Sequence, residues 1–428
     1  MSETIVLIVA AAVFAWSVVS ARLERADLTA PVVFMSVGAV LASSGTVDAP
    51  SAPETVKPLV EVTLVWVLFS DAARLPLQAL RQDVGMFVRL LAVGLPLTIL
   101  AGWGLAAWLF PALGVWLALL VAAALAPTDA ALGVPVVTNP AVPSRVRRVI
   151  TVESGLNDGI ATPVVMVAIA GTASAEALPG AAGLGTALLE LLVGAAVGAV
   201  VGSGGGWLLR AARRARWASE EFAGLGVLAL ALLSYLASTS LDGNGFIAAF
   251  VGGLTFGATA GRRGPAELLF LEQASGLVSL LVWLAFGAIA VPIVVDNPDP
   301  TTVLYAVLSL TLVRMVPVAL CCLGASLDRE TVLLIGWFGP RGLASLVFAL
   351  LALEELGAAA HEAVSVIAVT VLLSVLAHGV TAGPLAARYG RRQRRIAAAA
   401  QGESRRDPPL PDLPVRGLPR RSRAATPG

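Results

Sequence analysis

The chain has 428 residues, of which 57% are hydrophobic and only 13% are charged, and its mean hydropathy is +0.85. Because an average soluble domain has about 25% charged residues, this composition excludes a water-soluble globular protein. A net charge of +1 does not favour a nucleic acid as a partner. The two cysteines, Cys321 and Cys322, are adjacent, so they can form neither a disulfide framework nor a four-ligand zinc site. No cofactor is expected.

Long apolar segments recur along the chain from Thr4 to Thr381. Many contain about 18 to 25 residues, and a helix of that length crosses the ~30 Å hydrocarbon core of a bilayer. The approximate bounds of the segments are residues 4–20, 30–43, 58–70, 85–109, 112–137, 146–170, 184–209, 222–239, 244–259, 268–292, 301–323, 330–352 and 363–387. The predicted fold class is therefore an all-α polytopic membrane protein with about 13 transmembrane helices.

The charges beside these segments predict their orientation. Glu3 precedes the first segment and Arg22 follows it, which is the reverse of a cleaved signal peptide, so the N-terminus is predicted to lie outside. The inside connections then contain 14 arginines, whereas the outside connections contain only Lys57. This asymmetry is typical of the positive-inside rule. Together with the wealth of Ala, Gly and Arg, it predicts a multi-pass protein of a bacterial-type inner membrane with a cytoplasmic C-terminus.

Residues 391–428 form a basic segment that contains several prolines and lacks apolar periodicity. Such a composition predicts a disordered cytoplasmic tail. We interpret it as a solvated basic anchor, and the alternative is a lipid-binding or regulatory role.

An internal repeat is visible in the positions of helix-breaking residues. Segment 184–209 separates six segments from six, and the fifth segment of each half is interrupted in its middle. The interruptions are Ala-Pro-Thr-Asp at residues 126–129 and Gly-Pro-Arg-Gly at residues 339–342. Paired breaks at matching positions are typical of inverted-repeat secondary transporters, whose site lies near the bilayer midplane. We therefore expect two inverted six-helix repeats with discontinuous crossing helices.

Ionisable side chains at membrane depth mark a candidate site. A charge there costs at least ~2.5 to 3.5 kcal/mol, so it needs a partner, a water-filled cavity or a function. Six such residues are predicted, namely Asp71, Asp129, Glu153, Asp158, Arg314 and Arg341. Four of them lie at the two breaks or on the helix that follows the first break, which indicates one shared site. The histidines His361 and His378 are interpreted as packed or interfacial residues.

The helix that follows the first break presents oxygen ligands. Ser154 and Asp158 are four residues apart and share one helical face, while Glu153 and Asn157 lie on the neighbouring face. A hard cation prefers oxygen ligands, and the break at Thr128 would add a hydroxyl group and unpaired backbone carbonyls. The alternative is that Asn157 and Asp158 only join helices by hydrogen bonds.

The three segments together resemble the signatures of a known family. The residues at 126–129, Glu-Ser-Gly-Leu-Asn-Asp-Gly at 153–159 and the residues at 339–342 are similar to those of the monovalent cation/proton antiporters, in the NhaP-like branch of sodium/proton exchangers. Their order, separation and position on the broken helices also match, and the resemblance covers about residues 5–388. A looser match is Leu-Phe-Ser-Asp at 68–71, which resembles the family segment that places an acidic residue near the ion.

The resemblance implies a set of ion ligands. Asp158 would hold a proton and a monovalent cation in alternation, while Ser154, Thr128 and Asp71 would complete the shell around the ion. This chain has Ala130 where many members have proline, and Asp71 where glutamate is commoner. The side chain of Asp71 therefore reaches one methylene less far toward the ion.

The resemblance also implies supporting residues. Asn157 and Asp129 would brace the broken helix against its neighbour. Glu153 would pair with Arg341, so that two buried charges neutralise each other. Arg314 would form a salt bridge inside the bundle, with a snorkelling interfacial arginine as the alternative.

The implied activity is secondary active antiport of Na⁺ or Li⁺ against H⁺ by alternating access, which is transport and not an enzymatic reaction. Position 157 is Asn where the electrogenic branch of the superfamily has a second Asp, so the resemblance implies electroneutral 1:1 exchange. K⁺/H⁺ antiport is the alternative, since the same ligands can hold K⁺. A cation channel or an intramembrane aspartic protease would also use buried carboxylates, but would leave the broken-helix repeat unexplained.

The predicted domains follow from this resemblance. Residues 1–390 would form the antiporter domain, with a transport bundle at about 85–170 and 301–388 and a linker helix at about 184–209. The scaffold helices at about 4–70 and 222–292 would form the contact of a homodimer. The expected partners are therefore the cation, H⁺, the lipid bilayer and a second copy of the chain.

Overall fold

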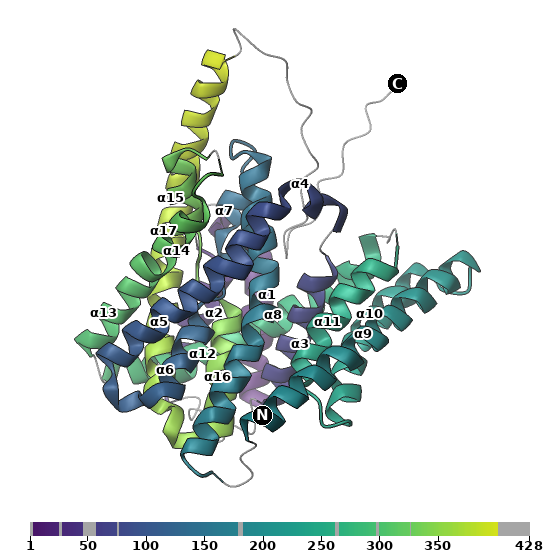
Figure 1. The fold of residues 1–428 in the computed structure, drawn as a ribbon, viewed down its shortest axis with the longest axis horizontal. Helices are drawn as coiled ribbons and strands as arrows, with labels where there is room; N and C mark the ends of the chain where they lie inside the picture. The colour runs from purple at the N-terminus through teal and green to yellow at the C-terminus, as the bar shows by residue number, and fades with distance from the viewer. Residues whose placement is uncertain are drawn as a thin grey trace.

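The computed structural model describes residues 3–24, 28–45, 57–74, 77–178, 183–261, 265–296, 299–325 and 327–400. Within these ranges the secondary structure is helical and contains no strand. Most helices are long and lie side by side, which gives a bundle that packs helix on helix (Figure 1). Eight helical stretches in the described chain are long and apolar enough to cross a membrane, and three further apolar helices are shorter.

Each predicted segment corresponds to one helix or to a run of consecutive helices in the described residues, which confirms the all-α polytopic fold class. The elements are α1 (Glu3–Glu24), α2 (Ala30–Ser43), α3 (Lys57–Ala73), α4 (Leu77–Val88), η2 (Arg89–Gly94), α5 (Leu95–Leu109), η3 (Pro111–Leu113), α6 (Gly114–Leu125), η4 (Ala130–Gly133), α7 (Val134–Val137), α8 (Ser144–Ala175), α9 (Leu184–Arg214), α10 (Glu220–Thr239), α11 (Gly245–Thr259), α12 (Pro265–Asp296), α13 (Pro300–Leu308), η5 (Ser309–Val313), α14 (Arg314–Cys321), α15 (Arg329–Trp337), α16 (Leu343–Leu356), η6 (Gly357–Ala360) and α17 (His361–Ala400).

Two of these runs are interrupted where the sequence predicts a break. α6 ends at Leu125 and helical structure resumes at Ala130, while α15 ends at Trp337 and α16 begins at Leu343. Pro127 and Pro340 lie in the two gaps, and a proline has no backbone N–H to donate within a helix. The breaks thus coincide with prolines in the sequence, although Pro163 and Pro384 lie within the continuous helices α8 and α17.

The two halves share a second irregularity that the sequence analysis did not identify. The π-helical segments η2 and η5 each lie in the fourth segment of their half, and a π turn inserts an extra residue into a helix. The two irregular helices pack together, because the thiol of Cys321 on α14 donates to the carbonyl of Arg89 in η2 at 3.2 Å. Their matching positions agree with a repeated six-helix unit.

Glycines spaced four residues apart bring α9 and α11 into close contact. Gly194, Gly198 and Gly202 face the backbone of Asn244, Ala248 and Gly252 respectively, and a Cβ atom at any of the three would overlap that backbone. Small residues at this spacing allow two helix backbones to approach closely in a membrane. α9 is therefore held along α11, and the two helices end side by side.

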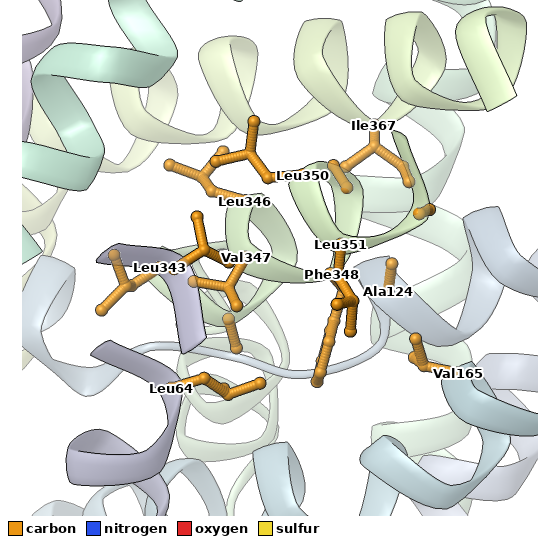
Figure 2. Close-up of a cluster of buried hydrophobic side chains, with 14 of the residues drawn as sticks. Leu64, Ala124, Val165, Leu343, Leu346, Val347, Phe348, Leu350, Leu351 and Ile367 are labelled. Atoms are coloured by element: carbon orange, nitrogen blue, oxygen red, sulfur yellow. The ribbon is translucent and has the colours of Figure 1, made fainter. Parts of the chain in front are cut away.

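α16 lies at the centre of the apolar core. Figure 2 shows its side chains, among them Leu346 and Phe348, surrounded by Leu64 of α3, Val165 of α8 and Ile367 of α17. A helix that is apolar on all sides has to be buried on all sides, and residues 341–352 of this segment are buried throughout. The second break is thus fixed in the interior of the bundle.

The last helix extends into the segment that the sequence assigns to the tail. α17 continues through Ala400, ten residues beyond the predicted start of the tail after residue 390, and residues 401–428 lie outside the described part of the chain. The last turns of α17 are attached to α15, since Arg392 pairs with Glu330 and the hydroxyl groups of Tyr389 and Thr331 lie 2.6 Å apart. These contacts compensate for the lack of an apolar pattern in the arginine-rich end.

Candidate functional site

The two unwound segments meet each other in the interior. The backbone N–H of Asp129 in the first break donates to the carbonyl of Pro340 in the second, at 2.8 Å. In return, Nη1 of Arg341 donates to the carbonyl of Ala126 at 2.7 Å. Backbone groups that lose their helical partners at one break therefore find partners at the other.

Each break also places a charged side chain at the end of a helix that borders the other break. The guanidinium of Arg341, which is 0% exposed, lies at the C-terminal end of α6, where helix dipoles favour a positive charge. The carboxylate of Asp129 accepts a hydrogen bond from the N–H of Leu343, the first residue of α16, at 3.3 Å. The N-terminal end of a helix favours a negative charge, so the two residues stabilise the crossing reciprocally.

The expected ion pair of Glu153 with Arg341 is not found. Glu153 instead pairs with Nη1 of Arg314 at 2.6 Å, and both side chains are buried. Arg314 begins α14 directly after η5, from where its side chain reaches α8. The guanidinium of Arg341 instead donates to the carbonyls of Ala126, Pro127 and Ser309.

The predicted ligand-bearing residues of α8 meet the first break. The hydroxyl oxygens of Thr128 and Ser154 lie 3.1 Å apart, and Nδ2 of Asn157 donates to the Thr128 hydroxyl at 2.8 Å. The Oδ1 atom of Asn157 is buried and has no hydrogen-bond partner among the described residues. Asp158 follows Ser154 by one helical turn on the same face and is 8% exposed.

The fourth predicted ligand, Asp71, approaches the same face of α8 from α3. A Cβ atom placed on Gly155 would lie 3.9 Å from both the Cβ and the carbonyl oxygen of Asp71. Since Gly155 has no side chain, α3 can come close to α8 just one turn before Asp158. Thr128 of the first break and Asp71 of α3 thus both meet α8, beside Ser154 and Gly155 respectively.

Two residues of α17 that the sequence analysis did not assign to the site hold the second break. Nε2 of His378 lies 2.8 Å from the carbonyl of Trp337, the last residue of α15, and the His378 ring stacks on the Trp337 ring. One turn earlier, the hydroxyl of Ser374 accepts the backbone N–H of Arg341 at 2.7 Å. Polar residues four apart in an otherwise apolar helix are the sequence signal that could have identified them.

The combination of two broken helices that cross in the interior with a buried carboxylate on an adjacent unbroken helix defines a class of proteins, the secondary transporters built from inverted repeats. The family model for the sodium/hydrogen exchanger, transmembrane, matches residues 8–388. The chain belongs to this family, whose members are transporters and not enzymes.

Individual relatives and solved structures agree with this assignment. The K⁺/H⁺ antiporter NhaP of Alkalimonas amylolytica is 26% identical over 377 residues, which cover 86% of this chain and 64% of that protein. The K⁺/H⁺ antiporter NhaP2 of Shewanella sp. strain MR-4 is 27% identical over 234 residues, which cover 54% of this chain and 40% of NhaP2. The chain thus spans less than two thirds of the length of these relatives.

The fold is similar to that of the sodium proton antiporter MjNhaP1 of Methanocaldococcus jannaschii. The structure of MjNhaP1 at pH 8 aligns with a TM-score of 0.70 at 20% identity, covering 90% of this chain and 98% of MjNhaP1. An electron-microscopy structure of the same antiporter aligns with a TM-score of 0.73 at 18% identity, covering 95% of this chain and all of MjNhaP1. This similarity establishes that the chain has the MjNhaP1 antiporter fold.

Proposed function

We propose that this protein is a secondary active antiporter that exchanges a monovalent cation for H⁺ at Asp158. The observation that supports this most directly is the contact of the Thr128 and Ser154 hydroxyl groups, 3.1 Å apart at the first helix break, with the buried Asp158 one turn after Ser154 on the same helical face. These oxygens are the ligands that hard cations prefer. The nearby Asp71 would complete the shell or attract the ion to it.

Exchange follows from competition at one carboxylate. A deprotonated Asp158 balances one bound cation, whereas a protonated Asp158 has no charge to offer and releases it. We propose that the site changes its access from one side of the membrane to the other only when Asp158 holds either a cation or a proton. Cation flux in one direction then requires proton flux in the other. The Asn157, Asp129, Glu153, Arg314 and Arg341 side chains would hold the breaks in place around that carboxylate.

The proposed cation is Na⁺, with Li⁺ as a second substrate, and the protein would contribute to sodium transport and pH homeostasis. K⁺ is the alternative, and it is compatible with the relatives NhaP and NhaP2, which are K⁺/H⁺ antiporters. Adding Na⁺, Li⁺ and K⁺ in turn to proteoliposomes with an imposed pH gradient decides between them. A cation flux that does not dissipate the pH gradient would instead identify a channel.

The test of the site is Asp158→Asn. The amide can neither bind a proton nor balance a cation, so this variant is expected to lose exchange completely while it still folds and inserts. Asp242→Asn is the matched control, because Asp242 is exposed and has a φ of 52°, a conformation that asparagine adopts readily. Cation-dependent proton flux in Asp158→Asn above that of empty liposomes would overturn the assignment.

The proposed placement in the cell is the inner membrane, with the N-terminus outside and the C-terminus in the cytoplasm. The distribution of 14 arginines against Lys57 in the connections supports this orientation. The proposed assembly is a homodimer through the scaffold helices at about 4–70 and 222–292, with the transport bundle at about 85–170 and 301–388 moving against them.

A further inference from the structure

A cavity of about 430 Å³ lies where α9 and α11 end side by side, outside the candidate ion site. It is lined by Arg210, Arg213 and Arg214 of α9 and by Ala260, which follows the last residue of α11. The three arginines are related by spacings of three and four residues, so they project from one side of the helix. None of the described residues that line the cavity is acidic.

The walls of the cavity hold the arginines in place. Nη2 of Arg213 donates to the carbonyl of Ala260 at 2.6 Å, which ties the end of α9 to the end of α11. Arg210 lies across the backbone of Gly261, where a Cβ atom would be 3.4 Å from Nε of Arg210. Gly261 has a φ of +72°, so a residue with a side chain would be strained there as well as crowded.

The charges of Arg210 and Arg214 are not balanced by carboxylates of the described chain. Neither Arg210 nor Arg214 forms an ion pair with any described residue. Like charges four residues apart on a helix repel each other, and the dipole at the C-terminal end of α9 offsets only part of that repulsion. An anion in the cavity would relieve the rest, and a guanidinium group matches a phosphate by two parallel hydrogen bonds.

The surface beside the cavity is suited to lipid. Trp207 and Trp217, which lie before and after the arginines, are 66% and 85% exposed, and Leu208 is also exposed. Exposed tryptophans near the ends of transmembrane helices are typical of the interface between the headgroups and the hydrocarbon. A basic pocket at this level, with an apolar helix surface next to it, fits a molecule with a phosphate at one end and acyl chains at the other.

We propose that this cavity binds the phosphate of an anionic phospholipid, whose acyl chains lie along the exposed side of α9. The bound headgroup contacts Arg210, Arg213 and Arg214 together, and it joins the ends of α9 and α11. Free inorganic phosphate offers the same anion without acyl chains and serves as the alternative ligand in the test. The proposal does not depend on which cation the protein transports.

The test measures lipid binding to the detergent-purified full chain by native mass spectrometry and by the shift of the thermal unfolding midpoint. Dioleoyl phosphatidylglycerol is expected to bind and to raise the midpoint, whereas dioleoyl phosphatidylcholine and inorganic phosphate are expected to have little effect. Arg210→Gln and Arg214→Gln should each weaken phosphatidylglycerol binding about fivefold, and the double variant about 25-fold.

The matched control is the double variant Arg22→Gln with Arg216→Gln. It removes the same charge at the same end of the bundle, since α1 and α9 are the first and seventh crossings, and neither residue lines the cavity. If this control loses as much phosphatidylglycerol binding as the double variant of Arg210 and Arg214, the loss is explained by general surface charge, and the proposal is overturned. If inorganic phosphate stabilises the protein as much as phosphatidylglycerol does, the proposal of a lipid ligand is also overturned. If the double variant Arg210→Gln with Arg214→Gln does not fold, the two single variants still provide the test.

Discussion

Arg314 and Arg341 are both buried arginines near the helix breaks, but they have different partners. Arg314 neutralises Glu153 directly, whereas Arg341 binds backbone carbonyls at the end of α6. The removal of one member of a buried ion pair leaves an uncompensated charge, which costs about 3 to 5 kcal/mol of stability. Arg341 stabilises the crossing through the helix end, so its removal affects the geometry of the breaks.

The pairing of Glu153 predicts the outcome of two double-mutant cycles. Glu153→Ala and Arg314→Ala should each lower the free energy of unfolding by about 3 to 5 kcal/mol, and the double variant should recover a large part of the combined loss. Glu153→Ala with Arg341→Ala should be closer to additive. Thermal unfolding of the purified variants measures both couplings, and a larger coupling to Arg341 than to Arg314 would contradict the observed pairing.

His378 predicts a second effect at the scale of single residues. Its Nε2 donates to the carbonyl of Trp337, which ends α15 and also accepts the N–H of Gly339. His378→Ala therefore removes one of the two donors to that carbonyl and should cost about 0.5 to 1.5 kcal/mol of stability. Exchange should also slow, because the second break is held less firmly. His378→Gln supplies an amide donor and should restore part of both losses. Equal behaviour of the Ala and Gln variants, measured by unfolding and by exchange in proteoliposomes, would argue against this positioning role.

At the scale of elements, the approach of α9 to α11 depends on residues without side chains. Gly202 faces the backbone of Gly252, while Gly204, two residues later on the same helix, has open space where its Cβ would be. The same substitution therefore has two different consequences on one helix. This contrast separates the effect of packing from the effect of helix propensity.

Gly202→Leu should force α9 away from α11 and destabilise the protein by about 1 to 3 kcal/mol or more. Gly204→Leu should be neutral or slightly stabilising, because leucine favours helix more than glycine does. Expression level and thermal unfolding midpoint of the two variants provide the comparison. A midpoint for Gly202→Leu equal to that of Gly204→Leu would show that the close approach of the two helices is not needed.

At the scale of the whole molecule, the proposed mechanism predicts that no net charge crosses the membrane in a cycle. Asp158 is the one carboxylate proposed to change between proton and cation, and Asn157 beside it does not titrate. On a solid-supported membrane, a cation gradient should therefore produce no sustained transport current, and an imposed membrane potential should leave the exchange rate unchanged. A sustained current that scales with the cation gradient would refute 1:1 exchange.

Asn157→Asp extends the same prediction. It places a second carboxylate next to Asp158 and should shift the pH profile of exchange through repulsion between the two acids. Transport should nevertheless remain insensitive to voltage, because the positive charge of the second break is already committed to carbonyls of the first through Arg341. The same current measurement on this variant tests the statement.

Much of the fold and part of the candidate site could be predicted from the sequence, for local physical reasons. The apolar segments have to be helices because no water is present in the bilayer to satisfy the backbone. Pro127 and Pro340 each remove a backbone N–H donor at the place where the helix is interrupted. Ser154 and Asp158 share a face because four residues make about one helical turn. These features depend on residues close together in the chain.

Tertiary structure alone decided which distant groups meet. Glu153 had two candidate partners, Arg314 and Arg341, in the other half of the chain, and only the tertiary structure selected Arg314. The partners of Arg341, the contact of His378 with Trp337 and the cavity between the ends of α9 and α11 depend on helix register in the same way. The rotation and depth of one helix against another are determined by the side chains of both, and no segment read by itself contains them.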